Sequence, residues 1–258
     1  MADSPAKRHF ARVTAAKEAA KKAPGQLMDG AGIYEQHMML LQDHRARLKN
    51  IQSGEGKAAF KRNVLPQYQA YIAGVLQADT GAQDTVVATV MVWLIDAGMY
   101  AAALDLAAYM LRHKLALPDQ FQRTTGCAVA EEIAEAALAA QQTGNVFDYG
   151  LLPKVIALTA SEDMPDQVRA KLYLAAGRAV LRRVADDVLP PAAELQGCVA
   201  DLRRAIELHG SCGGKKDLER AERALKKATA AANDQPDADS DQGDTSNENT
   251  PPADPADG

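Results

Sequence analysis

The chain has 258 residues, of which 47% are hydrophobic and only 5% aromatic, and alanine is very frequent. This composition favours closely packed helices over a β-sandwich, because Ala is the best helix former whereas Val, Ile, Tyr and Phe favour strands. Three cysteines exclude a disulfide-stapled secreted fold. No apolar run approaches the roughly 18–20 residues that cross a membrane, and the N-terminus lacks the apolar core of a signal peptide. We therefore expect an all-α protein of a reducing compartment.

The net charge of −5 conceals a gradient along the chain. Residues 1–62 contain 12 Lys/Arg and 6 Asp/Glu, residues 63–232 contain 17 and 20, and residues 233–258 contain none and 8. A basic N-terminal segment indicates a polyanionic partner such as nucleic acid, while the alternative is a solvated helix that happens to be basic.

Residues 1–32 are predicted to form a basic DNA-binding segment followed by a linker. Ser4 is suited to cap a helix that starts at Pro5 and ends before Pro24-Gly25, with Phe10 and Val13 as its bulky apolar anchors. Contacts from basic side chains to phosphates give salt-dependent affinity and little sequence readout. The candidate DNA-binding residues are Lys7, Arg8, Arg12, Lys17, Lys21 and Lys22.

Residues 33–80 are predicted to form a helical hairpin with an apolar stripe on each arm. The spacing of the stripes resembles a coiled-coil seam, and Pro66 is expected to kink the second arm or to start a new helix. Either the stripes pack on each other, or they also pack on neighbouring subunits. The candidate oligomerisation residues are Tyr34, Met38, Leu41, Leu48, Leu65, Tyr68, Ile72 and Val75. Basic residues at the turn of the hairpin continue the positive charge.

Residues 81–232 are predicted to form an α-helical array, with Gly98 and Gly144 at helix ends. Residues 165–228 resemble tetratricopeptide-type helix pairs, with Ala175, Ala176, Gly177 and Ala205 at close helix contacts. Residues 233–258 contain no Leu, Ile, Val or aromatic residue, so we expect a disordered acidic tail. The tail either competes with DNA for the basic segment or keeps the chain soluble.

No catalytic constellation stands out, and the catalytic residues are unknown at this point. Cys-x-x-Cys, His-Glu-x-x-His and the phosphate-binding loop of ATPases are all missing from the sequence, so no metal site and no cofactor are predicted. A nuclease would need carboxylates that converge on Mg²⁺. The candidate groups are 131–135, 162–166 and 186–187, although each is explained more simply by acidic residues at a helix start. The glycine-rich stretch 210–216 is either a turn or a phosphate cradle.

Several sequence runs, in one order from residue 4 to residue 228, resemble a known family. They are Ser4–His9, Arg12–Ala16, Tyr34–Gln36, Lys57–Ala59, Leu65-Pro66, Gly81–Asp84, Val90–Trp93, Asp96–Gly98, Ala103-Leu104 and Met164–Leu172. The family is the small, or endonuclease, subunit of the terminase of temperate contractile-tailed phages and related prophages. Members often end in Lys/Arg-rich segments, whereas this tail is acidic.

The resemblance implies a role in viral DNA packaging in the cytoplasm of the bacterial host cell. It implies binding to packaging-site (cohesive-end) double-stranded DNA, assembly into a homo-oligomer, and recruitment of the terminase large subunit, which carries the ATPase. It also implies an endonuclease assignment, for which Mg²⁺ would be the cofactor. The competing hypotheses are a true endonuclease and a helical-repeat adaptor without intrinsic DNA binding.

Overall fold

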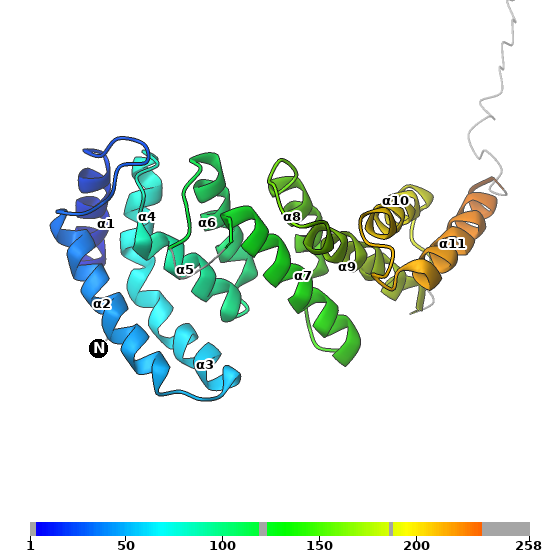
Figure 1. The fold of residues 1–258 in the computed structure, drawn as a ribbon, viewed down its shortest axis with the longest axis horizontal. Helices are drawn as coiled ribbons and strands as arrows, with labels where there is room; N and C mark the ends of the chain where they lie inside the picture. Colours follow the sequence, from blue (N-terminus) through cyan, green and yellow to red (C-terminus); the bar gives the residue numbers. More distant parts are fainter. Residues whose placement is uncertain (1–3, 119–122, 186–187, 234–258) are drawn as a thin grey trace, which may run out of the picture.

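The computed structural model describes residues 4–118, 123–185 and 188–233, and this part of the chain is all-α (Figure 1). The acidic tail, apart from Asn233, and the acidic pair at 186–187 lie outside the described residues. Two short 3₁₀ turns, η1 (Leu65–Tyr68) and η2 (Tyr149–Leu151), interrupt the α-helices. The helices are α1 (Pro5–Ala19), α2 (Gly32–Lys49), α3 (Gly54–Val64), α4 (Gln69–Ala78), α5 (Thr85–Asp96), α6 (Tyr100–Arg112), α7 (Thr125–Thr143), α8 (Leu152–Leu158), α9 (Asp166–Ala185), α10 (Ala192–Leu208) and α11 (Lys215–Asn233).

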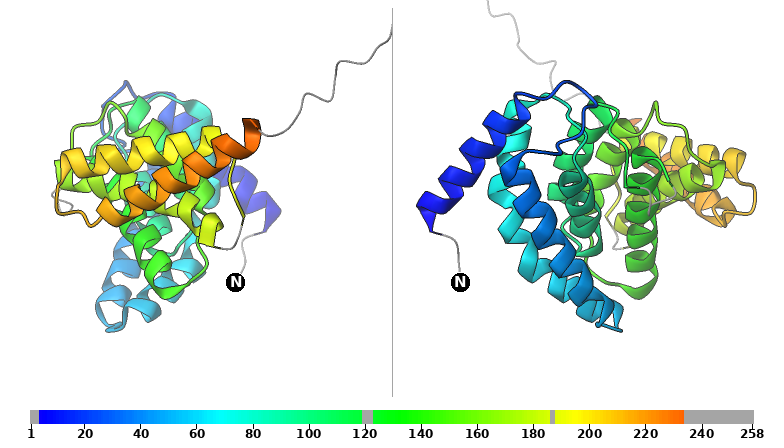
Figure 2. Two further views of the ribbon diagram at one scale, coloured as in Figure 1. Left: turned by 90° about the vertical axis from the view of Figure 1, so that its right-hand side faces the viewer. Right: turned by 60° about the vertical axis from the view of Figure 1, so that its left-hand side comes forward.

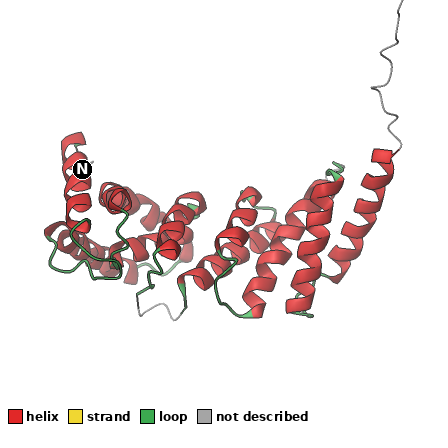
Figure 3. Cartoon of the chain, turned by 90° about the horizontal axis from the view of Figure 1, so that it is seen from above, coloured by secondary structure: helices red, strands yellow, loops and turns green. Residues whose placement is uncertain are grey.

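The helices follow one another in chain order along an elongated, curved row from α1 to α11 (Figures 1 and 3). One hydrophobic core extends from Ala15 in α1 to Ala176 in α9, and two smaller clusters join α9 to α10 and α11. The expected boundaries at residues 32 and 80 therefore do not divide the core. No helix among the described residues has the length and hydropathy needed to cross a bilayer.

Local signals set several helix ends. The Ser4 hydroxyl accepts a hydrogen bond from the Lys7 amide at 3.3 Å, which caps α1 as expected. Gly98 and Gly144 have φ angles of +75° and +74° beyond the ends of α5 and α7, in the left-handed region that glycine adopts at lowest cost. The break predicted at Pro66 is the 3₁₀ turn η1.

The N-terminal helix is anchored differently from the prediction. Phe10 is 67% exposed, whereas Ala15 and Ala19 are completely buried against α4. A Cβ on Gly74 of α4 would lie 2.2 Å from the Arg12 carbonyl oxygen. Small residues thus let the two backbones approach more closely than bulky anchors would allow, and a pattern of large apolar residues could not reveal this contact.

The chain runs along α2 and returns through α3 and α4 (Figure 1), but the interior of this region is shared with its neighbours. Helix α4 packs on α1, and α2 contacts both α1 and α5. Six of the eight predicted oligomerisation side chains are buried inside this one chain, and Met38 and Leu48 are half-buried against the same core. The six buried residues are Tyr34, Leu41, Leu65, Tyr68, Ile72 and Val75. The stripes are therefore internal packing surfaces, and they offer another subunit no exposed apolar seam.

Close helix contacts recur toward the C-terminus, where small residues were expected. A Cβ on Gly177 of α9 would lie 2.5 Å from Leu202 of α10, and Ala175 and Ala205 are completely buried. The stretch 210–214 forms the turn between α10 and α11, with Gly213 at φ +84°. Gly177 therefore allows the close approach of α9 and α10.

Candidate nucleic-acid interface

The first two turns of α1 project from the body of the protein. All residues from Ser4 to Phe10 are exposed, and the right-hand view of Figure 2 shows this end of the helix extending away from α2 and α4. The first half-buried residue is Ala11, although Arg8 and His9 already border a hollow beside Gln69 at the start of α4. The chain thus presents a short, capped and basic helix end to solvent.

The rest of α1 is held rigidly by neighbouring elements. The Glu18 carboxylate accepts a hydrogen bond from the Ile33 amide at 3.1 Å, in the first turn of α2, where Ala31 offers no side-chain cap. The Thr80 hydroxyl donates to the Ala19 carbonyl at 3.2 Å. These bonds and the α4 contact place the exposed end of α1 in a fixed orientation.

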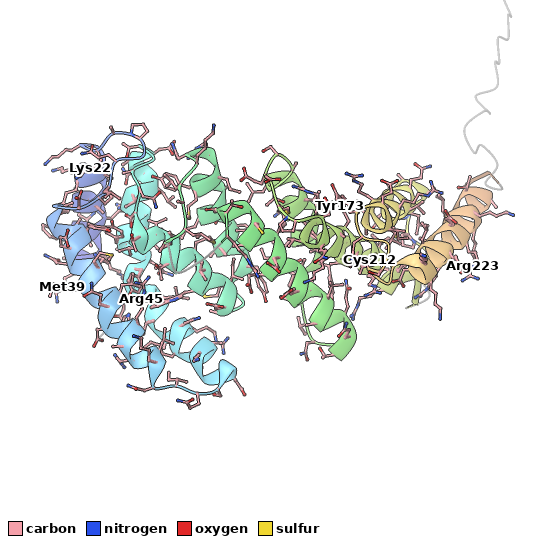
Figure 4. All side chains as sticks on the ribbon, viewed as in Figure 1. Lys22, Met39, Arg45, Tyr173, Cys212 and Arg223 are labelled. Carbon is pink, nitrogen blue, oxygen red and sulfur yellow. The ribbon has the colours of Figure 1, made fainter. Side chains whose placement is uncertain are left out.

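The segment predicted as a linker is also fixed. Its backbone pairs with the loop before α5, through bonds from the Gly25 amide to the Gly81 carbonyl at 2.8 Å and from the Met28 amide to the Gln83 carbonyl at 3.1 Å. Met28 is completely buried. Lys22 donates to the Asp29 carbonyl at 2.7 Å and lies 3.5 Å from its carboxylate (Figure 4). Lys22 therefore stabilises this loop, and it is a weaker candidate for a phosphate contact than the other five cations.

The other five cations are exposed, and none forms an ion pair with a residue in the described ranges. Arg8 and Arg12, one turn apart, line a shallow hollow of about 340 Å³ together with Gln69 of α4. Lys17 follows Arg8 by nine residues, or two and a half helical turns, and therefore lies on the opposite side of α1. Lys21 lies in the turn just after α1 ends. The cations are therefore distributed over two sides of this segment and do not form a single patch.

The basic residues around the hairpin turn are mostly occupied by internal contacts. Arg45 is half-buried and donates to the Thr89 hydroxyl at 2.8 Å, and burial lowers the pKa of its guanidinium (Figure 4). Lys61 pairs with Asp96, and Arg62 donates to the Ala97 carbonyl at 3.1 Å. Arg47 lies 3.7 Å from Asp43 and covers the Phe60 ring. Lys49 and Lys57 remain exposed. The positive surface of α1 is thus not continued by a broad free patch here.

The described acidic groups do not converge on a common point. Glu131 pairs with Arg123 and lies 4.0 Å from Lys171, which also contacts Glu135 at 2.6 Å. Asp163 and Asp166 face Glu131 across a hollow of about 770 Å³. Across the described ranges, no group of three His, Cys, Asp or Glu side chains has the geometry to hold a metal ion. Glu131 and Glu135 thus already have cationic partners in this arrangement.

Two buried polar clusters were not anticipated from the sequence. Asp84, completely enclosed, caps α5 by accepting from the Val86 and Val87 amides at 2.8 and 3.0 Å and also accepts from the Tyr71 hydroxyl. Burial raises the pKa of this carboxyl to about 6. His44 Nδ1 lies 2.7 Å from the Tyr68 hydroxyl, and burial lowers the pKa of its imidazole. Both clusters join elements of the core, which is a structural role.

The described residues define an all-α protein that carries an exposed, basic helix end. Comparison with known proteins then gives the family. Residues 38–167 match the family described as "Phage small terminase subunit". The chain is also 40% identical, over 223 residues that make up 86% of each sequence, to a protein of Escherichia phage P2 named "Terminase, endonuclease subunit". No solved structure matches. This chain belongs to the phage small terminase subunit family and therefore has a role in phage DNA packaging.

Proposed function

We propose that this terminase subunit binds double-stranded DNA at the packaging site through the exposed end of α1 and presents that DNA to the terminase large subunit in the bacterial cytoplasm. The observation that carries the proposal is the exposed helix end with Lys7 and Arg8, followed by the exposed Arg12 where α1 meets α4; none of the three forms an ion pair with another described residue. Family membership supports the packaging role. The family match begins at residue 38, so α1 is proposed on its own geometry.

Cations on two sides of α1 and of the turn that follows it suit a helix that lies in a groove. The major groove of B-DNA is about 12 Å wide and accepts an α-helix, with a phosphate backbone on each side. Arg8 and Arg12 would face one backbone, and Lys17 and Lys21 would face the other near the docked end of the helix. Such contacts position the protein, but they read little sequence. Recognition of one site would then depend on several copies that bind together.

Assembly into a homo-oligomer is part of the proposal and supplies this avidity. Linked binding modules raise overall affinity by about 10²–10⁴-fold when they engage one ligand together. The apolar stripes of α2 to α4 are internal, so subunits would meet through other surfaces. The large subunit would supply the ATPase and recognise the DNA-bound oligomer.

Endonuclease activity is the second candidate, because the phage P2 relative carries that name. Glu131, Asp163 and Asp166 line one hollow beside α7. A bound Mg²⁺ would have to replace the Arg123 partner of Glu131. Mg²⁺-dependent nicking by the isolated subunit, lost in Asp163→Asn/Asp166→Asn, would establish this activity.

The test is a mobility shift with the full-length chain on packaging-site and scrambled duplexes over a range of salt concentrations. The charge-reversal variant Arg8→Glu/Arg12→Glu should weaken binding to both duplexes and lower the salt slope by roughly 2, about one unit for each phosphate that is no longer neutralised. The matched control, Lys114→Glu/Lys154→Glu, changes the net charge equally at exposed sites distant from α1 in the sequence and should retain binding. If neither duplex shifts, the chain is an adaptor that meets DNA only through its partner.

A further inference from the structure

A second basic surface lies on α11, at the opposite end of the row from α1. Four cations, Lys216, Arg220, Arg223 and Lys227, recur at spacings of four, three and four residues. This spacing places them on one side of the helix. Ala221, Ala224 and Ala228 face the protein interior. Figure 4 shows Arg223 on α11 beside the last helices of the row.

Two of the three acidic residues of α11 have partners on other helices, and the third, Glu219, is exposed and forms no ion pair with another described residue. Asp217 accepts from Arg178 of α9 at 2.7 Å, and Glu222 accepts from Arg203 of α10 at 2.6 Å. Lys216, Arg223 and Lys227 are exposed and form no ion pair within the described residues, while Arg220 is half-buried and donates to the Leu181 carbonyl at 3.4 Å. Helix α11 thus keeps a positive face.

An anionic segment begins directly where α11 ends. Residues 234–258 carry eight Asp and Glu and no Lys or Arg. Helix α11 has 19 residues and is therefore about 28 Å long. A 25-residue segment spans up to roughly 80 Å when fully extended, so it can reach every position on the helix. Direct attachment also gives it an effective concentration of about 1 mM or more.

We propose that the acidic tail, residues 234–258, folds back onto the basic face of α11 in the same chain. Carboxylates of the tail pair with Lys216, Arg220, Arg223 and Lys227. Since the tail contains no Leu, Ile, Val or aromatic residue, the contact is electrostatic and weakens as salt rises. The paired face is then closed to other polyanions, including DNA. This proposal concerns α11 alone and does not depend on DNA binding by α1.

The binding test uses a labelled peptide with the sequence of residues 234–258 and a full-length chain in which the eight tail carboxylates are changed to amides. Fluorescence anisotropy should show salt-sensitive binding to this neutral-tail chain and at least tenfold weaker binding to the wild-type chain, whose own tail occupies the face. Arg223→Glu/Lys227→Glu in the neutral-tail chain should abolish binding. The milder Arg223→Gln/Lys227→Gln should weaken it, and Arg8→Glu/Arg12→Glu is the matched control that should retain it.

Four results would overturn the proposal. The first is equal peptide binding by the wild-type and neutral-tail chains, and the second is equal loss in the α1 and α11 variants. The third comes from zero-length carboxyl-to-amine crosslinking of mixed ¹⁴N and ¹⁵N wild-type chains. The proposal predicts crosslinks between the tail and Lys216 or Lys227 within single-isotope chains. Predominantly mixed-isotope crosslinks are the third result, and they would assign the face to the tail of a second copy. The fourth result is DNA binding at α11 without peptide binding, which would assign the face to nucleic acid.

Discussion

The contact between α1 and α4 at Gly74 can be tested by adding a single methyl group. In Gly74→Ala the new Cβ would lie 2.2 Å from the Arg12 carbonyl oxygen and 2.8 Å from the Ala15 Cβ. Neither group is the end of a flexible side chain, so α1 must move away. Forced insertion of a methyl group into a packed contact costs about 1–3 kcal/mol. Replacing a helix-interior glycine by alanine contributes about 1 kcal/mol in the opposite direction.

Gly197 provides a matched control for this substitution. It also lies inside a helix, α10, but a Cβ there would meet no heavy atom within 4 Å. Gly197→Ala should therefore stabilise the protein by up to about 1 kcal/mol. The difference between the two variants isolates the strain at the α1–α4 contact, and we expect Gly74→Ala to be less stable than Gly197→Ala by about 1–3 kcal/mol.

Urea unfolding, followed by the fluorescence of the single tryptophan, Trp93, measures both free energies. Hydrogen exchange then locates the change, because the amides of α1 should lose protection in Gly74→Ala and keep it in Gly197→Ala. Equal stabilisation by the two substitutions, with α1 still protected, would show that α1 does not pack on α4 as described.

Three further predictions concern the buried polar groups. Asp84→Ala should lower the free energy of unfolding by about 2–4 kcal/mol in urea titrations, because it removes the cap of α5 and leaves the buried Tyr71 hydroxyl without its acceptor. The folded-state pKa of Asp84, about 6, is raised above its ordinary value, so its contribution to stability should fall as pH rises from about 4 to 6. Asp84→Asn should remove that pH dependence, and an unchanged profile would refute it. Glu18→Ala should cost about 1 kcal/mol and increase hydrogen exchange at the start of α2, since it removes the acceptor for the Ile33 amide.

The helices themselves can largely be predicted from the sequence, because several of their ends depend on local chemistry. Ser4 with Pro5, Pro66, Gly98 and Gly144 each act within one turn of their own position, and each marks a boundary in the structure. The all-α class follows from the same local preferences together with the scarcity of aromatic residues.

The helices against which each helix packs cannot be predicted in the same way. An apolar stripe predicts that one face of a helix is buried, but it does not say against what. The coiled-coil spacing of the stripe with Tyr68 and Val75 allowed packing on a neighbouring subunit, whereas the structure buries this stripe inside its own chain. The contact of Ala15 with Gly74 joins small residues about sixty positions apart, so periodicity does not detect it.

The candidate interface shows the same division between local and distant effects. Charge counting found the basic helix, and Lys7 and Arg8 do lie at its exposed end, with the exposed Arg12 one turn further on. Lys22 and Arg45 carry the same charge as these residues, but they donate hydrogen bonds to Asp29 and Thr89 within the chain. Only the folded chain shows which cations remain available.

Lysine acetylation footprinting of the full-length chain, with and without a saturating packaging-site duplex, tests the central proposal most directly. DNA contact through α1 should slow modification of Lys7 and of Lys17 or Lys21 several-fold and leave Lys154 unchanged. Equal modification of Lys7 in the free and DNA-bound chain would contradict the account and place the DNA contact elsewhere.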